Sequence, residues 1–199
     1  MNSYELVPAF ADSVADSQHV FRVLLKSLSE PGLSHCVDRT DSLAELCQAG
    51  YGMALTLLDS STPVWLSPAL SSSKIQQNLS FHTGCQIVDE PEQALFAFLC
   101  EEEIGYIKRL NVGTDRDPEF SCTAIVQKND LDTGAQQMWS GPGILEQRLV
   151  NLDIDAEFWS IRAQKTAFPR GIDVFFVAKD RVLGLPRTTL VQVAQGSGE

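Results

Sequence analysis

Two apolar runs near the end of the chain, Ile172-Asp-Val-Phe-Phe-Val-Ala178 and Arg181-Val-Leu-Gly-Leu185, predict two neighbouring β-strands. They are rich in Val, Leu and Phe, and only the charged pair Lys179-Asp180 separates them, as on a turn. Strands that follow one another without an intervening helix usually pair antiparallel. The sequence therefore predicts antiparallel pairing in the second half of the sheet.

Helix-like and strand-like stretches alternate upstream of these strands, as far as about residue 100. A helix is predicted from Asp16, with Asp16 or Ser17 as its N-cap, to the Pro31-Gly32 stop, and the capping-box pattern of residues 42–45 predicts a second. Further helices are expected at 67–79, 101–110 and 155–166, and further strands at 63–66, 85–88, 94–99, 121–127, 136–139, 144–150 and 189–193; residues 53–58 fit either. This order predicts an α/β fold, a three-layer α/β/α sandwich with a mixed sheet.

The chain has 199 residues, of which 44% are hydrophobic and 21% charged, as in ordinary globular domains. No repeat, low-complexity tract or linker divides it. We expect one domain over residues 1–199, with an irregular arm at 1–15 and a frayed tail at 195–199.

The formal net charge of −11 argues against nucleic acid and anionic membrane surfaces as partners, because the long-range field has the wrong sign for both. The first residues carry neither a secretory nor a transit signal, and the longest apolar runs are too short to span a bilayer. Five cysteines without a CxxC pair suggest reduced thiols. We expect a cytoplasmic protein.

Charge is unevenly placed along the chain. Residues 89–119 hold nine acidic and three basic residues, a net −6, whereas residues 162–187 hold six basic and two acidic ones, a net +4. Three interpretations stay open for this basic quarter: a contact with a complementary subunit, a site for a small anion, or a solvated face of mixed charge.

Common catalytic signatures are missing, including phosphate loops, dinucleotide-binding loops and nucleophile elbows. The three histidines, His19, His35 and His82, are read as packed or capping residues, and Glu101-Glu-Glu103 as a solvated helix start. Cysteine and histidine spacing fits no metal site. No catalytic residue, metal or cofactor is therefore predicted.

Two arginines beside prolines are the sharper candidates for a binding site. Arg170 and Arg187 lie where the neighbouring proline restricts the backbone, and Thr188 and Thr189 add two hydroxyls. Together these four residues are candidates for holding a phosphate or carboxylate. The alternative is that Arg187 pairs with Asp173, or with a neighbouring acid, to close the loop onto the sheet.

Seven segments in register also identify a family. They are Ser17-Gln-His-Val-Phe-Arg-Val-Leu-Leu-Lys-Ser-Leu-Ser-Glu-Pro-Gly32, Thr62-Pro-Val-Trp-Leu-Ser67, Leu79-Ser-Phe-His-Thr83, Asp89-Glu-Pro-Glu-Gln-Ala94, Gly141-Pro-Gly-Ile144, Phe168-Pro-Arg-Gly-Ile-Asp173 and Leu185-Pro-Arg-Thr-Thr189. With these segments the chain resembles the PhnH family, subunits of the bacterial carbon–phosphorus lyase system, from about residue 8 to 193.

The resemblance implies an accessory, non-catalytic subunit of a core complex. That complex joins methylphosphonate to the ribose of ATP, giving ribose 1-methylphosphonate 5-triphosphate. It also implies a fold similar to the large domain of pyridoxal-phosphate-dependent transferases, without the cofactor. A homodimer is implied for the chain alone, with the other core subunits as partners.

Two further hypotheses stay open: an enzyme or anion-binding module that uses the basic quarter, and a surviving pyridoxal enzyme. No lysine follows a strand into a small-residue phosphate loop, which fits the cofactor-free interpretation.

Overall fold

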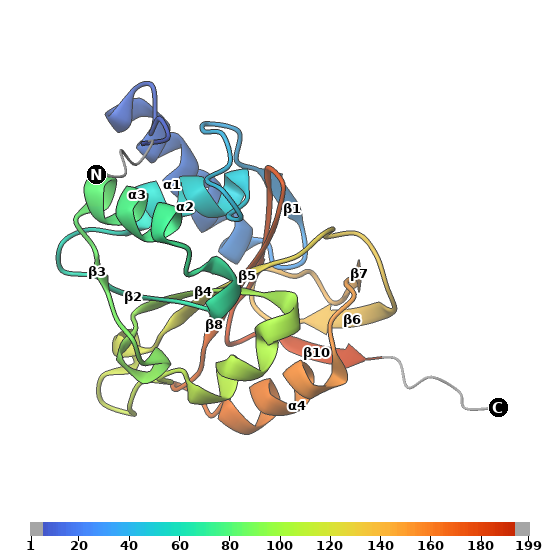
Figure 1. The fold of residues 1–199 in the computed structure, drawn as a ribbon. Helices are drawn as coiled ribbons and strands as arrows, with labels where there is room; N and C mark the ends of the chain where they lie inside the picture. The colour runs from blue at the N-terminus through green and yellow to red at the C-terminus, as the bar shows by residue number, and fades with distance from the viewer. Residues whose placement is uncertain (1–5, 194–199) are drawn as a thin grey trace.

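A seven-stranded mixed sheet forms the centre of the computed structural model, which describes residues 6–193. Its strand order is β1-β9-β8-β5-β4-β2-β3, in which β3, β2, β4, β5 and β8 run parallel while β9 and β1 pair antiparallel (Figure 1). The strands are β1 (Ser34–Cys36), β2 (Pro63–Leu66), β3 (Gln86–Ile87), β4 (Phe96–Cys100), β5 (Thr123–Gln127), β8 (Asp173–Ala178) and β9 (Arg181–Leu185). The predicted α/β class, the mixed sheet and the antiparallel β8–β9 pair are confirmed.

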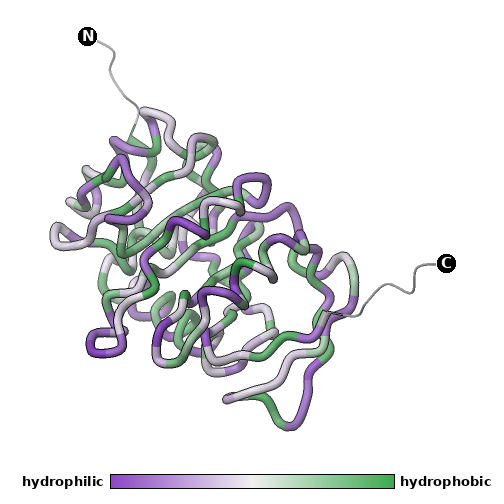
Figure 2. Tube along the Cα trace, turned by 90° about the horizontal axis from the view of Figure 1, so that it is seen from below, coloured by the Kyte–Doolittle hydropathy of each residue, from purple (hydrophilic) through white to green (hydrophobic). Residues whose placement is uncertain are grey.

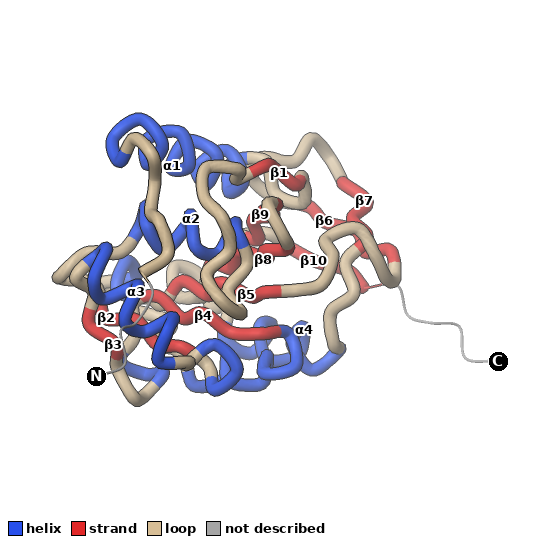
Figure 3. Tube along the Cα trace, turned by 45° about the horizontal axis from the view of Figure 1, so that its top comes forward, coloured by secondary structure: helices blue, strands red, loops and turns tan. Residues whose placement is uncertain are grey.

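Helices cover both faces of this sheet (Figures 1 and 3). One face carries α1 (Ser13–Ser29), α2 (Gln48–Leu57) and α3 (Ser73–Thr83), and the other carries α4 (Ala156–Lys165) and the 3₁₀ helix η3 (Glu101–Arg109). Short 3₁₀ turns are η1 (Pro68–Leu70), η2 (Pro91–Gln93) and η4 (Pro118–Phe120). A second sheet, β10-β6-β7, packs beside α4 and is built from β6 (Gln136–Ser140), β7 (Arg148–Asn151) and β10 (Leu190–Val193). The layer opposite α1–α3 is therefore partly sheet.

Two apolar clusters lie on opposite sides of the central sheet. Alternate residues of one strand serve different clusters: Phe98 on β4 packs against the α1–α3 side, and Leu99 packs against the α4 side. On β8, Phe175 and Phe176 divide in the same way. Strands buried on both faces read as continuous apolar runs, which is why these segments are identifiable in the sequence. Figure 2 shows hydrophobic stretches of the trace running between hydrophilic surface loops.

The first helix begins earlier than the sequence predicts. Its N-cap is Asp12, whose Oδ1 accepts the N–H groups of Val14 and Ala15 at 3.1 and 2.9 Å. Residues 13–15, expected within the irregular arm, are therefore helical, and neither Asp16 nor Ser17 is the cap. Residues 1–5 of that arm and the expected tail at 195–199 lie outside the described residues.

The capping-box prediction at residues 42–45 is wrong. Leu43 and Leu46 instead exchange two backbone hydrogen bonds of 2.9 Å across a tight turn, with Ala44 at φ 51°. Both leucine side chains are buried, so the turn satisfies the apolar spacing that suggested a helix. Helix α2 starts at Gln48 and takes in most of residues 53–58, which settles the helix-or-strand ambiguity there. The single-domain assignment of residues 1–199 stays a prediction.

Candidate functional site

Four parallel strands, β2, β4, β5 and β8, end at the same edge of the central sheet. Ligands of open α/β sheets bind at this carboxyl edge, so the residues that follow the strands are the first to consider. Glu101 follows β4, Lys128 follows β5 and Lys179 follows β8. The carboxyl edge therefore gathers charged side chains from three consecutive strand ends.

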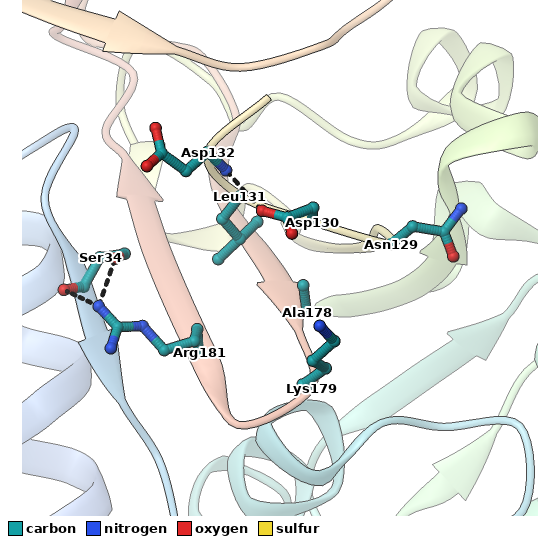
Figure 4. A pocket seen from close by; sticks show the side chains of 8 residues that line it. All are labelled: Ser34, Asn129, Asp130, Leu131, Asp132, Ala178, Lys179 and Arg181. Carbon is teal, nitrogen blue, oxygen red and sulfur yellow. Dashed lines mark hydrogen bonds between the residues drawn. The ribbon is translucent and has the colours of Figure 1, made fainter. Parts of the chain in front are cut away.

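A groove lies beyond the ends of β5 and β8, and we call it the edge groove (Figure 4). Its volume is about 240 Å³, and a second hollow of about 220 Å³ shares three of its residues and continues it toward β7. The lining residues of the edge groove are Ser34, Asn129, Asp130, Leu131, Asp132, Ala178, Lys179 and Arg181. The loop at 129–132 forms one wall, and the β8–β9 turn with the start of β1 forms the other.

The charges of the edge groove balance. Arg181 donates from Nη2 to the Ser34 hydroxyl at 2.6 Å and to its carbonyl at 3.2 Å, which fastens β9 to the edge strand β1. Asp130 accepts the N–H of Asp132 at 2.9 Å and so shapes the loop opposite. Lys179 and Arg181 thus face Asp130 and Asp132, with Leu131 between them in Figure 4. Such a lining can hold a polar ligand that carries both signs of charge, or a polar loop of a protein partner.

Lys128 is the residue of the carboxyl edge that sequence reasoning missed. Lys128 directly follows the strand expected at 121–127, where a solvated turn would be usual, but its side chain is only 4% exposed. Its Nζ donates to the Glu101 carboxylate and to the carbonyl oxygen of Asp153. A hollow of about 280 Å³ lies beside the pair, lined mainly by acidic residues. Burial of Lys128 depends on Glu101, 27 positions earlier, so no local pattern signals it.

Arg187, a predicted anion-binding residue, lies at the opposite edge, where β5 and β8 begin. Its Nη2 lies 2.6 Å from Oδ2 of Asp173, and its backbone N–H donates to Oδ1 at 2.7 Å. The other guanidinium bonds reach Ser121 Oγ and the carbonyl oxygens of Pro118 and Pro169, so all three nitrogens of the group donate within the chain. The alternative interpretation, in which Arg187 pairs with Asp173, is confirmed.

The other three candidate anion-binding residues, Arg170, Thr188 and Thr189, differ in exposure and in bonding. Arg170 is exposed and pairs through Nε with Asp115 at 3.0 Å. Thr188 is exposed, whereas Thr189 is buried with no hydrogen-bond partner for its hydroxyl among residues 6–193. Arg187, Thr188 and Thr189 are consecutive in the chain, and Arg170 follows Pro169, whose carbonyl oxygen accepts a hydrogen bond from Arg187. Anion binding by this set stays a prediction.

The turn that carries these threonines is anchored from α4. Arg162 donates from Nη2 to the carbonyl oxygens of Pro186 and Thr189, both at 2.8 Å. Burial lowers the pKa of Arg162 to about 10, only partly offset by the charge of Asp173. The buried guanidinium therefore acts as a fastener for the turn.

The acidic segment 89–119 and the basic quarter 162–187 lie against each other. Arg170 pairs with Asp115, and Arg187 donates to Pro118. Lys165 donates to the carbonyl oxygen of Leu110 at 3.1 Å. Part of the charge asymmetry seen in the sequence is therefore neutralised inside the chain.

All three histidines lie in helices or strands, His19 being in α1. His82 lies in the last turn of α3, with Nε2 2.9 Å from the carbonyl oxygen of Val7. His35 lies in β1, with Nε2 3.8 Å from Glu30, and burial lowers its pKa. Among residues 6–193, no group of three or more His, Cys, Asp or Glu side chains is placed to hold a metal ion, and no helix is long and apolar enough to cross a membrane.

Comparison with known proteins places the chain in a family. The family model described as "Bacterial phosphonate metabolism protein (PhnH)" matches residues 8–192. The chain is 36% identical over 193 residues to the alpha-D-ribose 1-methylphosphonate 5-triphosphate synthase subunit PhnH of Rhizobium meliloti (strain 1021), which covers 92% of this chain and 94% of that protein. It is 26% identical over 184 residues to the "Putative C-P lyase subunit protein HtxG" of Stutzerimonas stutzeri, covering 88% and 86%. As its sequence segments predict, the chain belongs to the PhnH family of bacterial phosphonate metabolism proteins.

Proposed function

We propose that this chain is an accessory, non-catalytic subunit of the carbon–phosphorus lyase core complex. Its role is to support formation of ribose 1-methylphosphonate 5-triphosphate from ATP and methylphosphonate through contacts with the other core subunits. The observation that carries the proposal is 36% identity to a subunit named for that synthase, over nearly the full length of both proteins. Because the similarity extends over nearly the whole length rather than one motif, it favours a shared role in an assembly.

The chemistry of the described residues supports a contact role. Arg187 and Lys128 use their charges in bonds within the chain. His82 faces a backbone carbonyl, and His35 faces Glu30 at a distance too long for a hydrogen bond. Among residues 6–193, neither His82 nor His35 is hydrogen-bonded to a serine, threonine or cysteine side chain, so neither forms a nucleophile–base pair there.

Three finer features belong to the same proposal. The chain is a cytoplasmic protein, it forms a homodimer when its partners are absent, and its layers resemble the large domain of pyridoxal-phosphate-dependent transferases without that cofactor. The seven-stranded mixed sheet between two apolar clusters supports the last of these.

The test is reconstitution from separately purified parts. The tagged chain is mixed at micromolar concentration with the other core subunits, and the mass of the assembly is measured by light scattering. Conversion of ATP and methylphosphonate is then followed with and without the chain. We expect co-assembly, a requirement for the chain in product formation, and no turnover by the chain alone. A chain that stays separate from its partners would contradict the proposal.

A second candidate function is a small-anion-binding module built on Arg170, Arg187, Thr188 and Thr189. The observation that favours it is the buried Thr189 hydroxyl, which has no hydrogen-bond partner within residues 6–193, next to the exposed Thr188. Calorimetric titration with methylphosphonate and with ATP tests it directly.

A further inference from the structure

Two large exposed aromatic side chains lie in segments that are both hydrogen-bonded to Arg187. Phe168 is 82% exposed and Phe120 is 58% exposed. The Arg187 Nη1 atom donates to the carbonyl oxygens of Pro118 and Pro169, which brings the two aromatic-bearing segments to one guanidinium. We call residues 118–120 and 168–170, with Arg187 between them, the phenyl platform.

The phenyl platform is held by bonds from several directions. Ala167 and Arg170 exchange two backbone hydrogen bonds, of 3.1 and 2.9 Å. The side-chain amide of Asn111 donates to the carbonyl of Phe120 at 3.2 Å. The backbone that carries both rings is therefore set before any partner arrives, which lowers the entropy cost of binding.

Such an arrangement is typical of a protein interface. Single exposed apolar residues are common on soluble proteins, but aromatic residues are enriched at interfaces. A ring fixed by its backbone and buried on association contributes much of the binding free energy. The feature that points to association here is that one fully bonded guanidinium holds both aromatic-bearing segments.

The charges around the rings favour a basic partner. Arg170 is already paired with Asp115 at 3.0 Å, and the highly exposed Arg116 lies 4.0 Å from Asp117. Glu119, next to Phe120, is exposed and forms no ion pair among the described residues. After these pairs are formed, one carboxylate beside the rings is left to meet a cation.

We propose that the phenyl platform docks this chain onto a subunit of the lyase core whose facing surface offers an apolar pocket bordered by Lys or Arg. The inference rests on the proposed function, because it names the surface that the accessory role uses. Phe168 enters the pocket, Phe120 packs at its border, and Glu119 meets the basic side chain. Interfaces of this kind combine a desolvated apolar centre with a complementary charged rim.

The experiment measures the dissociation constant between the full chain and the remaining core subunits for the wild type, Phe168→Ser, Phe120→Ser and Glu119→Lys. Phe81→Ser is the matched control, because Phe81 is a 67% exposed phenyl group on α3, on the opposite layer. We expect Phe168→Ser to weaken binding at least tenfold, Phe120→Ser and Glu119→Lys to weaken it less, and Phe81→Ser to leave it unchanged. Thermal unfolding of each variant checks that the fold is retained. We expect this because the substituted side chains are exposed and contribute little to the core.

The outcomes separate the two proposals. If the wild-type chain does not bind the core subunits at all, the proposed function fails. If the wild type binds and a Phe120→Ser/Phe168→Ser double variant binds equally well, the phenyl platform is not the docking surface, whereas the proposed function stands. Weakening by Phe81→Ser alone would place the contact on the α3 side and would also overturn the inference.

Discussion

Arg187 and Asp173 join the end of the β8–β9 hairpin to its beginning, with Nη2 of the arginine 2.6 Å from Oδ2 of the aspartate. The backbone N–H of Arg187 donates to the other carboxylate oxygen, so the acid binds both main chain and side chain. Their side chains are 17% and 25% exposed. Removing one member of a charge pair with this degree of burial costs more than removing one member of a surface pair, because the other member is left poorly solvated.

Replacement of Arg187 by alanine should destabilise the fold. We expect Arg187→Ala to lower the free energy of unfolding by about 2–4 kcal/mol, since it leaves Oδ2 of Asp173 and the Pro118 and Pro169 carbonyls without the guanidinium donor. Urea denaturation measures the change. Arg170→Ala is the matched control, because its pair with Asp115 is exposed and should contribute no more than about 1 kcal/mol. Equal effects of the two variants would contradict the structural role assigned to Arg187.

Anion binding by the four-residue set is tested with variants that leave the fold intact. If the set binds phosphonate or nucleotide, Arg170→Ala and Thr188→Ala should weaken that binding at least tenfold, about 1.4 kcal/mol, because both residues are exposed beside the turn. Isothermal titration with methylphosphonate and with ATP gives the constants. Binding that is absent in the wild type, or that both variants retain at wild-type affinity, would contradict this function.

The two members of the Lys128–Glu101 pair should respond unequally to removal. Lys128 is buried, whereas Glu101 is 31% exposed and can be hydrated without its partner. We therefore expect Glu101→Gln to lower the free energy of unfolding by about 2–4 kcal/mol and Lys128→Met to lower it by about half as much. Only Glu101→Gln leaves a buried charge without its counter-ion. Denaturation curves at neutral pH decide the order, and a larger loss for Lys128→Met would contradict it.

His35 should make the stability depend on pH. Burial is the largest cause of its lowered pKa, and Glu30 offsets that effect in part. The folded chain then binds the proton less readily than the unfolded chain, so the stabilising contribution is present above about pH 6.5 and is lost as pH falls through the lowered folded value. Unfolding measured between about pH 7.5 and about pH 5 should show a shallower decline in His35→Gln than in the wild type. Parallel profiles for the two proteins would rule the contribution out.

The turn at 141–143 packs against the end of α1 through a glycine. Gly143 has φ +82°, and a Cβ at this position would overlap the carbonyl oxygen of Ser29. Gly143→Ala should therefore cost about 2–4 kcal/mol, from the left-handed backbone and the displaced helix end. Gly105→Ala on η3 is the control, because a Cβ there meets nothing within 4 Å. Thermal unfolding of both variants measures the difference, and a harmless Gly143→Ala would mean that the turn moves freely from α1.

Local sequence patterns predicted the helices that bury one side along their whole length and the strands that are buried on both faces. The interiors of β4, β5, β8 and β9 are continuous apolar runs because both faces of the sheet are covered, and these strands were predictable for that reason. The segment at 42–46 was not, since two buried leucines three residues apart fit a helix and a tight turn equally well. Glu45, expected to cap a helix there, instead accepts a hydrogen bond from Ser72 Oγ at 3.0 Å.

Candidate site residues were harder to place because their roles depend on partners distant in the chain. Arg187 was singled out correctly as a fixed guanidinium, and the sequence also offered its pairing with Asp173 as an alternative. Nothing near Lys128 in the sequence indicates that Glu101 neutralises it inside the fold. Long-range pairing of this kind follows from sheet order, which a single sequence does not determine.

The contact between the acidic segment and the basic quarter affects how association of this protein depends on ionic strength. With many of its cations used internally, the molecule presents an excess of negative charge that follows from its net −11. Like charges repel, and dissolved ions weaken that repulsion over roughly 10 Å at about 0.1 M salt. Self-association should accordingly tighten as sodium chloride is added, whereas attachment to a basic partner should loosen. Opposite salt trends would thus tell the two kinds of contact apart in a single titration series.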